Sequence, residues 1–106
     1  MVITMDDRRR GFESKWAHDA ELRFQVEARR NRALGEWAAS KKGLTGAAVE
    51  DLVASVIAAD FEEVGDEDVF RKLRSELDAS VSDAAIREKM RECLQAAMGE
   101  ERRDAK

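Results

Sequence analysis

Apolar residues recur at helical spacing along the chain, and the pattern is clearest between residues 49 and 64. The apolar positions there recur at spacings of three and four, which places them on one face of a helix. This stripe consists of Val49, Leu52, Val53, Val56, Ile57, Phe61 and Val64. Thr45 is the expected N-cap, with Leu44 and Val49 as a hydrophobic staple, and Gly65 is the expected end. The pattern predicts one amphipathic helix with a buried stripe.

Two further helices are predicted in the second half of the chain. The first opens with the carboxylates of residues 66–68, which suit the positive end of a helix dipole, and buries Val69, Phe70, Leu73 and Leu77. The second begins at Ser82 as N-cap, with Val81 and Ile86 as a staple. Its apolar face contains Met90, Cys93, Leu94, Ala97 and Met98, and Gly99 is expected to end it.

A longer and more polar helix is predicted from about Asp19 to Lys42, with Gly43 as its end. Its candidate buried positions are Leu22, Phe24, Ala28, Leu34, Trp37 and Ala38. Short links between helices force neighbouring helices to turn back on one another. We therefore predict an all-α protein, a compact four-helix bundle over residues 19–99, with a flexible N-terminal arm at 1–18 and a charged tail at 100–106.

The N-terminal arm, residues 1–18, is charged and interrupted by Gly11, yet Met5, Phe12 and Trp16 fall on one helical face. A segment of this length is marginal as an isolated helix in water. A partner's groove that buries these three side chains, with acidic groups opposite Arg8, Arg9 and Arg10, would allow the arm to fold on binding. Two alternatives stay open: the arm extends the first helix and packs on the bundle, or it is a terminus without a role.

Composition and charge exclude some classes of function for this chain. The chain has 106 residues, no proline and 40% charged residues, and its formal net charge is −4. Residues 43–78 contain ten carboxylates and three basic residues, a net charge of −7, which opposes binding to nucleic-acid phosphates. No apolar run is long enough to span a bilayer, and MVITMDDRRR lacks the apolar stretch of a secretory signal. We expect a cytoplasmic protein without direct membrane insertion.

Three strings keep their order along most of the chain: FESKWAHDAELRF at 12–24, ARRNRALGEWAA at 28–39 and DFEEVGDEDVFRKL at 60–73. Together they resemble the zeta subunit, the inhibitory protein of alpha-proteobacterial F-type ATP synthases. The combination FxxKxAHD, ARRN and GxWAA is specific, because several residue types recur together at fixed spacing. Ala33 stands where the family's first helix has a leucine, and Trp16 where a smaller aromatic residue is usual.

The resemblance implies a non-enzymatic inhibitor whose N-terminal region enters the catalytic sector between the alpha and beta subunits, near gamma, and arrests rotation in the direction of ATP hydrolysis. It also implies a cytoplasmic bacterial protein that lies at the cytoplasmic face of the membrane when bound, and we expect a monomer when it is free. The predicted partner-binding residues are Met5, Arg8, Arg9, Arg10, Phe12, Lys15, Trp16, Ala17 and His18. The rival hypothesis is a general helical adaptor that binds through a face of the bundle.

Other candidate chemistry is weaker. His18 is the only histidine, so neither a histidine metal cluster nor a catalytic relay is expected, and its role is that of a contact residue or a pH sensor. The sequence has no P-loop or GxGxxG motif, and we expect no cofactor. An enzyme would need converging titratable groups in a pocket, and a small bundle with one histidine argues against such a site.

Three more groups have two interpretations each. One group is the acidic cluster of Glu62, Glu63, Asp66, Glu67 and Asp68. A helix cap and an acidic surface explain this cluster better than a cation site, since it lacks the EF-hand spacing. The acidic surface would be attracted to a basic partner or to Arg29, Arg30 and Arg32. Cys93 is expected as a small buried hydrophobe, with redox sensing as the minor alternative. The same three arginines are a poor candidate for DNA binding in an acidic protein.

Overall fold

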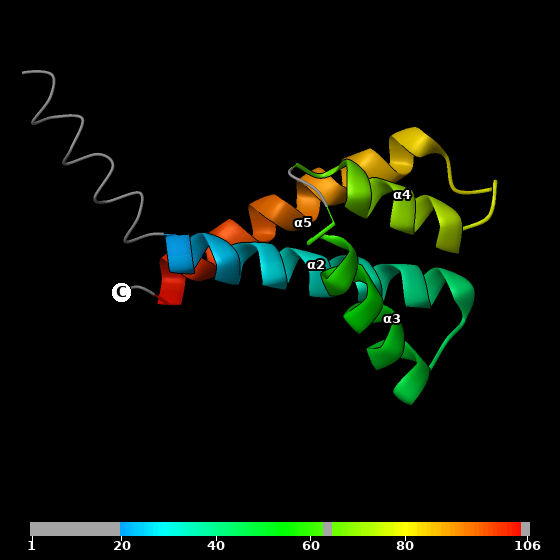
Figure 1. Ribbon diagram of the computed structural model, residues 1–106, viewed down its shortest axis with the longest axis horizontal. Helices are drawn as coiled ribbons and strands as arrows, with labels where there is room; N and C mark the ends of the chain where they lie inside the picture. Colours follow the sequence, from blue (N-terminus) through cyan, green and yellow to red (C-terminus); the bar gives the residue numbers. More distant parts are fainter. Residues whose placement is uncertain (1–19, 63–64, 105–106) are drawn as a thin grey trace, which may run out of the picture.

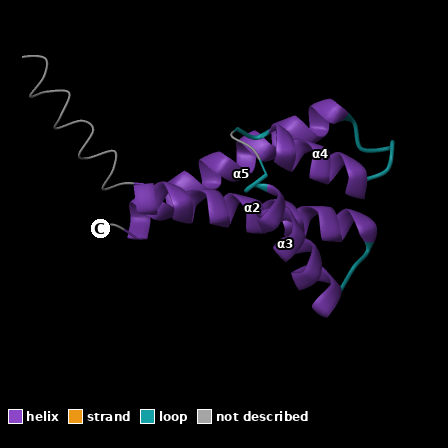
Figure 2. Ribbon diagram, viewed as in Figure 1, coloured by secondary structure: helices purple, strands orange, loops and turns teal. Residues whose placement is uncertain are grey.

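The computed structural model describes residues 20–62 and 65–104, and all regular structure in these ranges is helical (Figures 1 and 2). Four helices follow one another there: α2 (Ala20–Lys42), α3 (Ala47–Ala59), α4 (Glu67–Glu76) and α5 (Asp83–Asp104). α2 packs against both α3 and α5, and α4 contacts α3 and α5. The predicted all-α bundle of four helices is confirmed. None of the helices in these ranges is both long and apolar enough to cross a bilayer.

The first predicted helix is observed almost within its expected bounds. It ends at Lys42 because Gly43 takes the left-handed conformation, with φ of 71°. Two hydrogen bonds close the end, from the amide of Gly43 to the carbonyl of Ser40 and from the amide of Leu44 to the carbonyl of Ala39. These two bonds form a Schellman motif, which satisfies carbonyls that the helix leaves without partners.

One apolar core joins the four helices. Its buried members are Leu34, Ala38 and Ala39 of α2, Leu52 and Val56 of α3, Val69, Leu73 and Leu77 in and after α4, and Ile86 and Met90 of α5. Burial of each large aliphatic side chain stabilises the fold by roughly 1.5–3 kcal/mol relative to leaving it in water. The core therefore uses the helical stripes that the sequence pattern predicts.

α2 and α3 cross obliquely in Figure 1, and they approach closely at Gly35. A Cβ atom at Gly35 would lie 2.7 Å from the Cα atom of Val53 and 2.9 Å from its Cγ2 atom. Any larger side chain at this crossing would push the two helices apart, because the nearest atom belongs to the backbone and cannot rotate away. The absence of a side chain at Gly35 sets the separation of the two helices.

The predicted bounds of α3 are wrong at both ends. The N-cap is Gly46 and not Thr45, because the chain turns at Gly46 with φ of 63°, a conformation that glycine adopts readily. At the other end the helix stops at Ala59, and the amides of Phe61 and Glu62 bond to carbonyls three residues back, which tightens the chain into a turn. Gly65, with φ of 96°, lies in the link to α4.

The start of α4 and the start of α5 agree with prediction. Asp66 is the N-cap of α4, and two carboxylates occupy the first turn. At α5 the hydroxyl of Ser82 accepts a hydrogen bond of 3.0 Å from the amide of Ala85, which is the expected N-cap bond. Val81 and Ile86 on either side of the cap both pack against the core, as a hydrophobic staple requires.

The predicted end of α5 is wrong, because the helix passes through Gly99 and continues to Asp104. Gly99 does not adopt a positive φ, and a glycine inside a helix costs only about 1 kcal/mol relative to alanine. The residues that follow are mostly good helix formers. Met98, predicted on the buried face, is 42% exposed.

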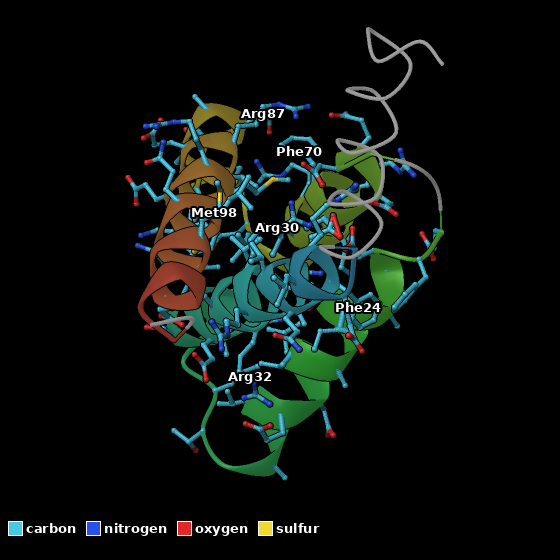
Figure 3. The ribbon with its side chains drawn as sticks, turned by 90° about the vertical axis from the view of Figure 1, so that its left-hand side faces the viewer. Phe24, Arg30, Arg32, Phe70, Arg87 and Met98 are labelled. Carbon is cyan, nitrogen blue, oxygen red and sulfur yellow. The ribbon has the colours of Figure 1, made fainter. Side chains whose placement is uncertain are left out.

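Two other predicted core positions are also exposed. Phe24 of α2 is 56% exposed and Phe61 after α3 is 66% exposed. Phe24 lies in the first turns of α2 (Figure 3), and Phe61 follows the end of α3, where it meets the Phe24 ring. Val64, the last position of the predicted stripe, lies outside the described residues.

Candidate partner-binding surface

The predicted partner-binding residues of the arm, from Met5 to His18, lie outside the residues that the structure describes. The structure does describe where their segment joins the bundle, at Ala20, the first residue of α2. The surface next to this junction is the described region in which a contact with the same partner would lie. It contains the three arginines of α2, the acidic link between α3 and α4, and the exposed phenylalanines.

Arg30 is 2% exposed and lies between the helices (Figure 3). Its guanidinium donates hydrogen bonds to Asp66 at 2.8 Å, to Asp60 at 3.4 Å and to the side chain of Asn31 at 3.0 Å. Asn31 in turn donates to Asp60 at 2.9 Å. A buried cation is tolerated only when its donors are matched by acceptors, and here two carboxylates and an amide supply them. This network fixes both ends of the α3–α4 link to α2.

Arg32 lies two residues further along α2 and has a different environment. It is half-exposed beside α3 and pairs with Glu50 at 3.1 Å and with Glu36 at 3.5 Å. The hydrogen bond and charge of Arg32 hold the pKa of Glu50 below its usual value. Arg30 is therefore engaged inside the bundle, whereas Arg32 stays at the surface and pairs there with carboxylates of α2 and α3.

The acidic link is likewise matched by basic groups of the same chain. Asp66 accepts from Arg30, and Glu67 accepts from Arg87 of α5 at 2.9 Å. The hydrogen bonds from Arg87 lower the pKa of Glu67, and the guanidinium carbon of Arg87 lies 3.9 Å from the centre of the Phe70 ring. In the part of the chain that the structure describes, no three acidic, histidine or cysteine side chains converge as metal ligands would. Attraction to Arg30, one of the predicted interpretations, is confirmed for Asp66.

Cys93 packs against the core from α5 and is half-buried. Burial is the main cause that raises the pKa of its thiol above the ordinary value. A raised pKa keeps the group as a thiol at neutral pH, which is less reactive than a thiolate. The environment agrees with the predicted packing role.

Phe24 and Phe61 form the most apolar exposed feature near the junction. Their ring centroids are 6.0 Å apart and the rings are tilted by 38°, a common geometry for an attractive aromatic pair. They border a pocket of about 260 Å³ between α2 and the end of α3. We name this the aromatic pocket; it is lined by Arg23, Phe24, Glu27, Ala28, Asn31, Ile57, Asp60, Phe61 and Gly65.

Sequence reasoning did not identify the aromatic pocket. Helical spacing placed both phenylalanines on apolar stripes, and a stripe residue is normally buried. Both side chains are nevertheless exposed, and for Phe61 the reason is that α3 ends at Ala59, before the predicted stripe reaches it.

Comparison with known proteins relates nearly the whole chain to one family. The family model described as ATPase inhibitor subunit zeta matches residues 2–100. The matched range contains the N-terminal arm, the four helices up to Glu100, and all three strings on which the sequence resemblance rests. A search of curated proteins found no match.

Proposed function

Because the chain belongs to the ATPase inhibitor subunit zeta family, we propose that it inhibits ATP hydrolysis by the F-type ATP synthase and that residues 1–18 are its inhibitory element. The observation that carries the proposal is the family match, which begins at residue 2 and therefore includes this arm. The protein acts in this proposal by binding, without a reaction of its own. It lies at the cytoplasmic face of the bacterial membrane when it is bound to the synthase.

The arm inserts between the alpha and beta subunits near gamma. Met5, Phe12 and Trp16 are spaced to occupy one face of a helix, and that face is buried in a groove of the catalytic sector. Arg8, Arg9 and Arg10 meet acidic groups beside the groove. Ordering the arm costs conformational entropy, so part of the contact energy is offset and the inhibitor stays releasable.

The bundle stays outside the groove and limits how far the arm can be drawn into it. Its core, with Leu34, Leu73 and Ile86 fully buried, makes a rigid body that cannot follow the arm into a narrow groove. The Arg30 network holds the α3–α4 link onto α2, and α2 joins this body to the arm. Rotation of gamma against an inserted, anchored arm is then blocked in the hydrolysis direction.

The test is ATP hydrolysis by the purified synthase, titrated with the full chain and with Phe12→Ala/Trp16→Ala. We expect inhibition by the wild type and a loss of potency of at least tenfold in the variant, because buried aromatic anchors dominate binding energy. Arg91→Ala, which removes an exposed arginine of α5, is the control and should inhibit like the wild type. Circular dichroism should show the same helix content in all three proteins.

The rival adaptor hypothesis makes the opposite prediction. If a face of the bundle binds the partner, removal of residues 1–18 leaves inhibition intact. A truncated chain that blocks hydrolysis as well as the full one would overturn the proposed role of the arm.

Sedimentation of the free full chain should show a monomer.

A further inference from the structure

Two large, exposed aromatic side chains, Phe24 and Phe61, meet at the surface of the bundle. Single exposed apolar residues are ordinary, and Met98 on α5 is one such case. Phe24 and Phe61 differ because they are 37 positions apart in sequence and are brought into ring contact by the fold. Contact between exposed aromatics beside a hollow is typical of a binding hot spot.

The aromatic pocket combines apolar and polar lining residues. Ala28 and Ile57 are half-buried and line it beside the two phenylalanines, and the charged residues Arg23 and Glu27 also line it. Asn31 and Asp60 complete the polar part, and their side chains are hydrogen-bonded to each other and to Arg30. Since these polar groups already have partners, an apolar side chain can enter without leaving them unsatisfied. The site is preorganised, which lowers the entropy cost of binding.

The position of the pocket indicates its occupant. Phe24 lies four residues after Ala20, a rise of about 6 Å along α2, and the N-terminal arm joins the helix at Ala20. A partner that holds the arm is therefore within reach of Phe24. The aromatic side chains of a bound arm are buried in that partner and cannot also cover the pocket. In the complex, the pocket faces either water or the surface of the same partner.

We propose that the aromatic pocket receives an apolar side chain from the catalytic sector of the ATP synthase and so docks the bundle beside the inserted arm. This inference rests on the proposed function and adds a second contact point to it. Phe24 and Phe61 are positioning residues in this account: they hold the bundle in place while the arm blocks rotation. Because the arm joins α2 close to the pocket, one partner surface can contact both the arm and the pocket.

The experiment is the same hydrolysis titration with Phe24→Ala/Phe61→Ala in the full chain. We expect the concentration for half-maximal inhibition to rise about tenfold, as for the loss of a hot spot, and the inhibitor to dissociate faster. Complete inhibition at saturation should persist, because the arm is intact. Met98→Ala, which removes an exposed apolar side chain on a different helix, should stay within about twofold of the wild type.

Two further measurements test whether a loss of potency comes from misfolding of the variant. The unfolding midpoint of the double variant should match that of the wild type, because both side chains are more than half exposed. Phe24→Ala and Phe61→Ala made singly should each lose part of the potency, and Phe24→Leu/Phe61→Leu should retain most of it, since leucine keeps an apolar surface.

Several outcomes overturn the inference. Wild-type potency in the double alanine variant, together with loss of potency in Phe12→Ala/Trp16→Ala, excludes the pocket as a contact while the proposed function stands. Stronger inhibition by the double alanine variant would mean that the arm itself occupies the pocket in the free protein. A wild-type dimer that the double variant abolishes, at unchanged potency, would identify a second copy as the occupant. A wild-type chain that does not inhibit overturns both proposals.

Discussion

At the scale of single residues, Arg30 and Arg32 show how environment changes the role of one residue type. Both belong to the basic cluster of α2, and only two positions separate them. Arg30 is buried and bonded to Asp60, Asp66 and Asn31, whereas Arg32 is half-exposed and pairs with carboxylates that face water. Removing one partner of a buried network leaves charges without compensation, whereas exposed pairs contribute little.

We expect Arg30→Ala to lower the free energy of unfolding by about 2–4 kcal/mol, because Asp60 loses its buried partner and a cavity forms between the helices. Arg32→Ala is the matched control on the same helix and should leave the urea midpoint nearly unchanged. Equilibrium unfolding in urea, followed by circular dichroism, checks both. Equal losses in the two variants would contradict the assigned difference in environment.

At the scale of elements, the two predicted N-caps had different outcomes. Ser82 caps α5 with a hydrogen bond to the amide of Ala85, as expected. Thr45 does not cap α3, because the chain turns at Gly46 and the helix begins one residue later, with no side-chain cap bond. Both residues are of a type that caps helices, and each precedes a helix with one apolar face. Which residue takes the N-cap position of α3 depended on the backbone conformation that the neighbouring Gly46 permits.

Ser82→Ala should therefore lower the free energy of unfolding by about 1 kcal/mol, since it leaves an amide of the first turn of α5 without its acceptor. Thr45→Ala is the corresponding variant at the other helix and should have a much smaller effect. Thermal unfolding of the two variants side by side gives the comparison. A larger loss for Thr45→Ala than for Ser82→Ala would mean that Thr45 caps α3 in solution.

At the scale of the whole molecule, α2 is the central helix, which packs against both α3 and α5. An ion pair also links the C-terminal end of α2 to α4. Lys42 at the end of α2 contacts Glu76 of α4 at 2.5 Å, and Lys72 contacts the same carboxylate at 2.8 Å. The two lysine hydrogen bonds hold the pKa of Glu76 below its ordinary value of 4.5. A carboxyl whose pKa is lower in the folded protein stabilises the fold above its unfolded pKa, and this contribution disappears as the pH falls through the folded pKa.

We expect the stability of the protein to decrease below about pH 4.5, where this contribution begins to be lost. Glu76→Gln should be less stable than the wild type at pH 7 by under about 1 kcal/mol, because the pair is partly exposed. The difference should vanish in acid, once the wild-type carboxyl is protonated. Urea unfolding at several pH values measures this. A difference that stays constant down to strongly acidic pH would rule out the charge of Glu76 as its cause.

Much of the bundle could be predicted from local sequence. The stripes through Leu34, Val56, Leu73 and Ile86 are periodic, and helical periodicity indicates which face is buried regardless of the partner helix. The candidate site was predictable only in part: the assignment of the arm rests on motif and resemblance and stays a prediction, while the aromatic pocket was not found. Predicting the pocket required the end of α3, which depends on a turn held by contacts with α2.

The sequence by itself determined that four helices form, the end of α2 at Gly43 and the cap at Ser82, because these depend on residues within one or two turns of each other. Tertiary structure alone decided that Arg30 is buried, that α3 stops at Ala59, and that Phe24 meets Phe61. These features join residues about 30 positions or more apart, or depend on such contacts. Their free energies depend on which surfaces come together in space, and spacing along the chain does not contain that information.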